Sequence, residues 1–320
     1  MRIDRMGEAR LIRLIQRTVK SRGRLRVGIG DDGCVLKNGT VVTTDAYAEG
    51  VHFELAYMSY EQVGARCACA ALSDVVAMGA EPEVLVVALG LRKGMTDSEV
   101  RALYRGIERV CAQLNCEVGG GDIILLDRLV LALTATGRTK RPKLRSEANP
   151  DERLFVTGYL GLAETGRLAL KLRLPKRGLL PAIRRHIEPL PRIQVLRRLG
   201  ASVRALIDTS DGLATDARHI GELSRVRVVL WLDKLPIHPA THRLCRAMGL
   251  DPVRFALCSG EDYELLFTAR RLVVSSVDRV PITCIGSIEA GSGLYSVSKD
   301  RLMPVLEIGY DHLTAGQTIT

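Results

Sequence analysis

Aspartate residues directly follow short apolar segments at several points along this chain of 320 residues. In the clearest case, the stretch from Arg26 to Asp45, an apolar segment enters a glycine turn and two adjacent acids follow, Asp31 and Asp32. A second apolar segment, 41–44, then ends on Asp45. Layered α/β folds gather the side chains of their functional sites at the ends of strands. The pattern therefore favours a fold of alternating strands and helices whose strand ends converge on one site.

The glycine turn contains a literal G-x-G-x-x-G pattern, Gly28–Gly33, which is typical of dinucleotide phosphate loops. In such loops, backbone N–H groups and a helix N-terminus hold the pyrophosphate. Asp31 and Asp32 would repel the same anion unless a cation lay between them. We therefore interpret the stretch as part of a metal site.

Two domains are expected, because 320 residues exceed what one hydrophobic core usually supports. Between Gly137 and Glu152 the sequence becomes polar and basic and contains two prolines, which is typical of a linker. We predict an N-terminal domain over residues 1–140 and a C-terminal domain over residues 141–320.

Strand and helix patterns alternate in both halves, which predicts an α/β or α+β fold. Ser59, with Gln62 three residues later, resembles a capping box and predicts a helix that runs to about Met78. The other elements expected in the N-terminal half are helices over 7–20 and 97–114, strands over 84–91 and 129–136, and a tight turn at 119–122. In the C-terminal half we expect strands over 154–158, 205–207, 226–232 and 264–268, and helices over 163–171, 191–200, 213–224 and 238–248.

Asp74 lies within a helix sequence that is mainly small and apolar, as expected of a buried helix. A buried, unpaired carboxylate costs several kcal/mol, so a positive group should face it. The acid-rich turns themselves contain no Lys or Arg. Mg²⁺ prefers oxygen ligands, and Thr43 and Thr44 would add oxygens beside Asp45. Further acids occupy the turns at the ends of later strands: Asp122, Asp208 and Asp211.

Each of these acids also has a purely structural interpretation. Asp208, Ser210 or Asp211 would serve as a cap for the helix after Gly212. Asp31 or Asp32 would stabilise a turn through the side chain. Several carboxylates around more than one Mg²⁺, with glycine turns that admit phosphate closely, instead indicate phosphoryl transfer, in which catalysis is mostly positioning and charge neutralisation.

The formal net charge of +10 would attract polyanions, but no recognition motif or interleaved aromatic residues accompany it, so we expect neither nucleic acid nor a membrane as partner. The longest apolar runs, such as 84–91, are shorter than the roughly 18 residues that span a bilayer. The first residues lack a signal sequence, and eight cysteines in a chain of this length do not make a disulfide framework. We expect a cytoplasmic protein.

The motifs together resemble those of thiamine-monophosphate kinases, a family of the PurM-like (AIR-synthetase-related) superfamily. The resemblance covers nearly the whole chain and rests on nine segments in family order: 28–33 (GIGDDG), 43–53 (TTDAYAEGVHF), 72–80 (LSDVVAMGA), 120–122 (GGD), 154–161 (LFVTGYLG), 189–193 (PLPRI), 207–213 (IDTSDGL), 259–267 (SGEDYELLF) and 309–312 (GYDH).

This resemblance implies Mg²⁺-dependent transfer of a phosphoryl group from ATP to thiamine monophosphate, without a covalent protein intermediate, so that metal-assisted transfer at residues such as Asp74 and Asp211 carries the reaction. It implies a two-domain homodimer whose N-terminal sheets pair into a barrel. The implied Mg²⁺ ligands are Asp32, Thr43, Thr44, Asp45, Asp74, Asp122, Asp208 and Asp211; which of Asp31 and Asp32 binds metal stays open. The residues implied to contact ATP are Gly121, Asp122, Arg145 and Ser210, and those implied to contact thiamine monophosphate are His52 and Glu261.

Two alternatives stay open on the sequence. One is a related enzyme that uses ATP on a different small acceptor. The other is a nonenzymatic protein that binds nucleotides or nucleic acid and whose acids are structural. A binding module has little reason to place Asp74 within an apolar helix, which favours an enzyme.

Overall fold

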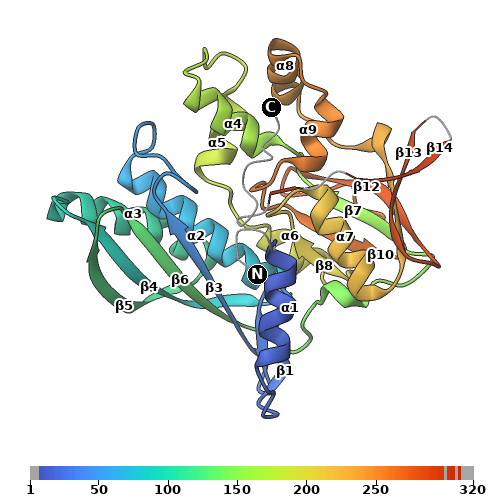
Figure 1. Cartoon of the computed structure of the whole chain (residues 1–320), viewed down its shortest axis with the longest axis horizontal. Coiled ribbons are helices and arrows are strands. Elements are labelled where there is room, and N and C mark those ends of the chain that lie inside the picture. The colour runs from blue at the N-terminus through green and yellow to red at the C-terminus, as the bar shows by residue number, and fades with distance from the viewer. Residues whose placement is uncertain (1–6, 299–300, 307–308, 311–320) are drawn as a thin grey trace.

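The computed structural model describes residues 7–298, 301–306 and 309–310, and its strands form two sheets, one from each half of the chain (Figure 1). This arrangement confirms the predicted α/β class. The linker that follows Arg138 contains the short 3-10 helix η2 (Arg145–Glu147) and leads to the second sheet at Arg153. Within the described ranges, no helix is both long and apolar enough to cross a membrane.

The first sheet has six strands in the order β1-β2-β3-β6-β4-β5, and helices α2 and α3 lie over one of its faces (Figure 1). Its strands are β1 (Leu25–Val27), β2 (Cys34–Leu36), β3 (Thr40–Ala48), β4 (Glu81–Arg92), β5 (Glu117–Leu126) and β6 (Val130–Arg138). The helices of this half are α1 (Glu8–Thr18), α2 (Tyr60–Ala77) and α3 (Asp97–Leu114).

Helix α2 begins where the sequence predicts, because Ser59 and Gln62 form a complete capping box. Helix α3 begins with the same device, formed by Thr96 and Glu99. Helix α2 is almost wholly buried between the first sheet, α3 and the C-terminal half. The position of Asp74 is therefore fixed by packing on several sides.

Two glycines let α2 and α3 touch backbone to backbone. A Cβ atom on Gly64 of α2 would lie 2.0 Å from the Leu103 carbonyl oxygen, and a Cβ atom on Gly106 of α3 would lie 1.9 Å from the Glu61 carbonyl oxygen. Real Cβ atoms do not approach so closely, so only glycine fits at either position.

The predicted tight turn at 119–122 is wrong, because these residues lie inside strand β5. The pairing of β5 with β4 shifts register between Leu85 and Val86, so the extra glycine forms a bulge rather than a turn. A Cβ atom on Gly121 would lie 1.8 Å from the Val87 carbonyl oxygen. Glycine is thus present here because β4 approaches closely.

The second sheet has eight strands, with the path β14-β13-β9-β12-β7-β10-β8 and β11 paired to β12. These strands are β7 (Arg153–Thr157), β8 (Leu206–Asp208), β9 (Arg227–Trp231), β10 (Leu265–Ala269), β11 (Ser276–Val277), β12 (Val280–Glu289), β13 (Gly293–Ser298) and β14 (Arg301–Pro304). The helices of this half are α4 (Leu162–Lys171), α5 (Leu180–Ile187), α6 (Ile193–Leu199), α7 (Leu213–Ser224), α8 (Pro239–Met248) and α9 (Pro252–Cys258). Helices α5 and α9 and strands β11 to β14 were not predicted from the sequence.

The two halves pack directly on each other. The largest buried hydrophobic cluster contains residues of both, among them Leu72 of α2 and Phe155 and Phe267 of the second sheet. Helix α2 contacts both β8 and α5. A site made of residues from both halves therefore has a rigid frame.

Candidate metal and phosphate site

Three carboxylates meet where the two halves join. Asp32 precedes β2, Asp74 lies in the last turn of α2 and Asp208 ends β8. One oxygen atom from each carboxylate lies within 4.8 Å of those of the other two. Sequence positions separated by more than a hundred residues thus form one cluster, which we call the carboxylate centre.

Hydroxyl groups fix the orientation of these carboxylates. The Oγ atom of Ser73 donates a hydrogen bond of 2.6 Å to Oδ2 of Asp208. Helix α2 therefore contributes Asp74 to the centre and, through the preceding residue, also holds Asp208. Thr43 Oγ1 donates a hydrogen bond of 2.7 Å to Asp74 Oδ2. The Tyr47 hydroxyl donates to Asp45 Oδ2, also at 2.7 Å.

The two adjacent acids of the first turn have different surroundings. Asp31 accepts hydrogen bonds from the backbone N–H groups of Asp32, at 3.1 Å, and of Arg145, at 3.2 Å. Asp32 instead belongs to the carboxylate centre, where its Oδ1 also accepts from the Arg145 guanidinium. The geometry favours Asp32 over Asp31 as the metal ligand.

Arg145 provides a positive charge beside these acids. The acid-rich turns contain no base of their own, but the linker supplies one that pairs with Asp32. This arginine neutralises one side of the centre only. Asp74 lies among other acids, and its pKa is raised well above its usual range by burial and by the carboxylates of Asp45, Asp208 and Asp32.

A divalent cation fits the carboxylate centre. Two buried oxygen atoms that belong to it, Oδ2 of Asp32 and Oδ1 of Asp208, have no hydrogen-bond partner. Burial, with the charge of Asp32, raises the pKa of Asp208 to about 8. Buried oxygens that repel one another and lack donors are costly in the folded protein. A cation that prefers oxygen ligands, such as Mg²⁺, would reduce this repulsion and contact the oxygens that lack hydrogen-bond donors.

Thr44 and Asp122 lie apart from this centre. Successive side chains of β3 alternate between faces, so Thr44 points away from Thr43 and Asp45 and is exposed, with its hydroxyl 3.1 Å from that of Thr134. The register aligns Asp45 with Leu133 of β6, Leu133 with Val87 of β4, and Val87 with Gly121 of β5. Three strand spacings, about 14 Å, therefore separate Gly121 and Asp122 from Asp45.

The turn after β8 brings Ser210 and Asp211 to the start of α7. The C-terminal segment returns to this turn, because the backbone N–H of Tyr310 donates to the Asp211 carbonyl oxygen at 2.9 Å. Of the GYDH segment, residues 311 and 312 lie outside the described residues.

Sequence reasoning missed Asp216, a fully buried carboxylate in the first turn of α7. Its Oδ2 accepts a hydrogen bond of 3.1 Å from the backbone N–H of Gly212, and its Oδ1 has no partner. Burial and the charges of Asp211 and Asp208 raise its pKa well above the usual range. No spacing in the sequence distinguishes this residue from an ordinary acid in the first turn of a helix.

His52 and Glu261 approach α2 from opposite halves of the molecule. His52 lies in the loop after β3, where its Nδ1 accepts a hydrogen bond of 3.1 Å from the backbone N–H of Ala48. Glu261 lies in the loop between α9 and β10, and its carboxylate forms a 2.7 Å ion pair with Arg66 of α2. The structure thus brings the two together around one buried arginine.

The literal phosphate-loop pattern does not form a nucleotide-binding loop of the Rossmann type. Residues 28–33 join strands β1 and β2, and no helix follows them to present its N-terminus.

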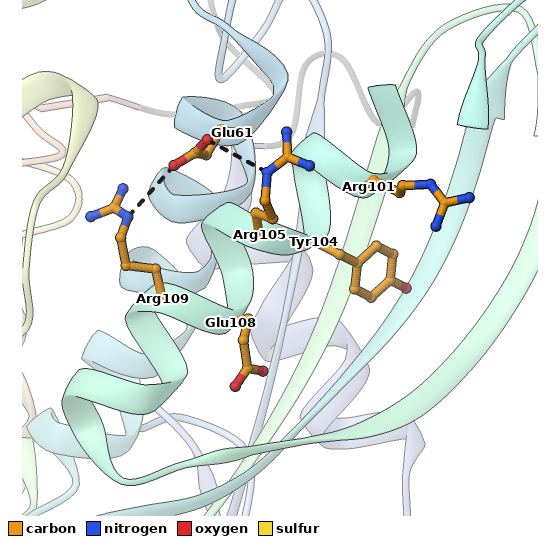
Figure 2. Close-up of a pocket in the computed structure, with 6 residues that line it drawn as sticks. All are labelled: Glu61, Arg101, Tyr104, Arg105, Glu108 and Arg109. Carbon is orange, nitrogen blue, oxygen red and sulfur yellow. Dashed lines mark ion pairs between the residues drawn. The ribbon is translucent and has the colours of Figure 1, made fainter. Parts of the chain in front are cut away.

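One hollow on the described surface lies away from this site. It measures about 660 Å³ and is lined by α2 and α3 through Glu61, Arg101, Tyr104, Arg105, Glu108 and Arg109 (Figure 2). Glu61 lies within 3.9 Å of both Arg105 and Arg109, so these charges largely satisfy one another. Thirteen residues of helix, about 20 Å, separate Glu61 from Asp74. This hollow is therefore not part of the carboxylate centre.

Comparison with known proteins identifies relatives over almost the whole chain. Residues 30–139 match the family described as AIR synthase related protein, N-terminal domain. The sequence is 33% identical to the thiamine-monophosphate kinase of Aquifex aeolicus over 92% of this chain and 95% of that protein. It is 32% identical to the thiamine-monophosphate kinase of Bacillus subtilis over 96% of this chain and 99% of that protein.

Solved structures give the same result. A structure described as AaThiL complexed with AMPPCP and TMP has a TM-score of 0.88 at 32% identity, covering 98% of this chain and 99% of that chain. The hydrogenase maturation protein HypE of E. coli has a TM-score of 0.68 at 18% identity, covering 84% of this chain and 86% of that chain, and shares the fold alone.

The two sheets, with an acidic centre where they meet, define this protein as a member of the AIR-synthase-related, or PurM-like, class. Within this class, the chain is 33% identical to a thiamine-monophosphate kinase over 95% of that protein, which identifies its family. The chain belongs to the thiamine-monophosphate kinase family.

Proposed function

We propose that this protein transfers the γ-phosphoryl group of ATP directly to thiamine monophosphate, giving thiamine diphosphate. Members of its family bear the name of this activity, and a relative of 0.88 TM-score is described with the ATP analogue AMPPCP and with TMP. The observation that carries the proposal is the carboxylate centre, because phosphoryl transfer requires fixed oxygens that hold cations and the centre provides them.

Magnesium is the cation that this donor set suits, and Asp32, Asp74 and Asp208 would hold it. Bound there, Mg²⁺ would neutralise the charge that develops on the transferring phosphoryl group. Asp45 and Asp211, from β3 and the turn after β8, would extend the ligand set to further ions. Thr43 orients Asp74 through its hydroxyl. The side chain of Thr44 points to the opposite face of β3, so Thr44 would contribute a ligand only through its backbone oxygen.

The remaining residues divide between the two substrates. Arg145 and Ser210 border the carboxylate centre, and we assign them to the phosphates of ATP together with Gly121 and Asp122. A charged guanidinium is well suited to phosphate. His52 and Glu261 are assigned to thiamine monophosphate.

We further propose that the protein is a homodimer joined through β5. In the described part of the chain β5 is an edge strand, and Ile123, Ile124 and Leu125 are 63%, 55% and 63% exposed. An edge strand with consecutive exposed apolar side chains is a template for pairing with another chain.

Replacement of Ile124 by glutamate should convert the dimer to a monomer, because each buried charge would oppose pairing of the edge strands. Light scattering after gel filtration measures the mass. Leu223→Glu, at an exposed leucine of α7, is the matched control and should stay dimeric.

The function is tested by incubating the protein with ATP, MgCl₂ and thiamine monophosphate and measuring thiamine diphosphate as its fluorescent oxidation product. Product that requires both ATP and MgCl₂ is the expected result. If AMPPCP binds but no thiamine diphosphate forms, the acceptor is a different small molecule. If neither AMPPCP binding nor product is detected, the proposal fails.

Without divalent cations, the free energy of unfolding should fall as the pH rises from about 4 to about 8. The pKa of Asp208 is about 8 in the folded protein, against an ordinary value of 3.8. Between these two pKa values the carboxyl loses its proton in the unfolded state but keeps it in the folded state. The stabilisation is therefore complete below the unfolded pKa and is lost as the pH rises to the folded pKa, by at most about 1.4 kcal/mol per pH unit.

Urea unfolding at several pH values measures this slope. MgCl₂ should reduce it, whereas NaCl of equal ionic strength should not. In the Asp208→Asn variant, the free energy of unfolding should depend less steeply on pH, because the contribution of Asp208 is removed. An identical slope with and without MgCl₂ would count against a metal at this centre.

A cytoplasmic location is also part of the proposal. All eight cysteines are free thiols, which suits a reducing compartment. ATP and thiamine monophosphate are then the partners, without nucleic acid or membrane.

A further inference from the structure

Arg66 lies in the middle of α2 and is only 3% exposed. Its guanidinium group contacts three separate segments of the chain. Nε donates a hydrogen bond of 3.2 Å to the carbonyl oxygen of His52, in the loop after β3. Nη1 donates to the carbonyl oxygen of His186, at the end of α5. Nη2 forms the 2.7 Å ion pair with Glu261.

Two of these three segments carry the residues assigned to thiamine monophosphate. His52 comes from the N-terminal half and Glu261 from the C-terminal half, so Arg66 connects the acceptor residues across the join. With almost no exposed surface, Arg66 itself has no access to a substrate. It can act only through the residues that it holds.

The backbone around Glu261 adopts a conformation that needs such support. Glu261 and Tyr263 have φ angles of 62° and 48°, in the left-handed region that non-glycine residues rarely adopt. The N–H of Glu261 donates to the Ser210 carbonyl oxygen at 2.8 Å, and that of Tyr263 donates to the Thr209 carbonyl oxygen at 3.0 Å. The Glu261 loop is therefore bound directly to the turn beside the carboxylate centre.

Helix geometry relates Arg66 to the carboxylate centre. Seven residues separate Arg66 from Ser73, so both lie on the same face of α2, about 10 Å apart along its axis. Both face the C-terminal half: Ser73 donates to Asp208, and Arg66 pairs with Glu261. One rigid helix thus spaces the acceptor residues from the metal-binding residues.

We propose that Arg66 is a positioning residue for the acceptor: it holds the Glu261 carboxylate and the His52 loop at the distance from the carboxylate centre at which thiamine monophosphate is bound for transfer. This role rests on the proposed function. A planar guanidinium can direct donors to three segments at once, whereas the ammonium group of lysine is a compact point charge. Charge alone should therefore not replace Arg66.

The test compares Arg66→Lys with wild type in steady-state kinetics, varying each substrate in turn. We expect kcat/KM for thiamine monophosphate to fall about 100-fold, because small displacements of positioned groups have effects of that size. The KM for ATP should stay within about twofold, since Arg66 does not contact the residues assigned to ATP. For Arg66→Met, kcat/KM for thiamine monophosphate should fall further. If that variant does not fold, the comparison of Arg66→Lys with wild type is still a complete test.

Arg192→Lys is the matched control. Arg192 is another largely buried arginine and forms a bidentate ion pair with Glu264, rather than with Glu261. Its variant should lose stability but keep the wild-type KM for thiamine monophosphate. A similar change in both variants would mean that Arg66 has only a structural role and would overturn the inference.

A double-mutant cycle with Glu261→Gln provides a second readout. If Arg66 acts through Glu261, Arg66→Lys should have little further effect on kcat/KM for thiamine monophosphate once Glu261 is replaced. Effects that multiply independently would overturn the inference. Wild-type protein without activity on thiamine monophosphate would instead overturn the proposed function, whereas active wild type with an unaffected Arg66→Lys variant refutes the role of Arg66 alone.

Discussion

Replacement of Asp74 by asparagine should lower turnover at least about 1,000-fold, an effect of the size seen when one charge-stabilising group is removed from a phosphoryl-transfer site. The metal-free variant should nevertheless be at least as stable as the wild type. Asp74 is surrounded by Asp45, Asp208 and Asp32, whose charges and burial raise its pKa. Asparagine removes this repulsion and can still accept the hydrogen bond from Thr43.

The measurement pairs kinetics with urea unfolding, each with and without MgCl₂. The wild type should gain stability from MgCl₂, by about 2.7 kcal/mol at a concentration 100 times the dissociation constant. Asp74→Asn should gain much less. Asp127→Asn, at an exposed acid paired with Lys93, is the control and should behave as wild type. Undiminished turnover of Asp74→Asn would exclude a metal role for Asp74.

Replacement of Gly106 by alanine should destabilise the protein by about 3 kcal/mol, the upper part of the usual range for overpacking. Alanine is intrinsically the better helix former by about 1 kcal/mol. That gain is outweighed, because the new Cβ atom would lie 1.9 Å from the Glu61 carbonyl oxygen and must push α3 away from α2.

Thermal and urea unfolding measure this effect, with Gly28→Ala as the matched control. The nearest atom to a Cβ on Gly28 is Cδ1 of Leu25, at 4.0 Å, so the control should not lose stability. Turnover of Gly106→Ala should fall as well, since α2 carries Asp74. A Gly106→Ala protein as stable as wild type would show that the helices can separate freely.

Local signals in the sequence were sufficient for most helices and strands of the first sheet. The capping box of Ser59 and Gln62 sets the start of α2 because its hydrogen bonds lie within four residues. The glycines before Asp122 misled the prediction, since three consecutive glycines usually mark a turn. Their actual cause is the approach of β4, which depends on strand pairing and is invisible in local sequence.

The candidate site divides in the same way. Asp74 could be recognised because an acid in an apolar helix violates a local rule, whereas its partners in the carboxylate centre are set by the tertiary fold. The pairing of Arg145 with Asp32 joins residues 113 positions apart, and no spacing rule predicts such a contact. Arg66 was missed because an arginine in a helix is ordinary until its three buried contacts are seen.

The division of the carboxylate centre between the two halves also matters during synthesis. Asp32 and Asp74 leave the ribosome well before Asp208, at ordinary translation rates by roughly ten seconds. During that interval the nascent chain lacks the residue that completes the centre. A chain truncated before Asp208 therefore lacks one of the three carboxylates and cannot form the complete centre.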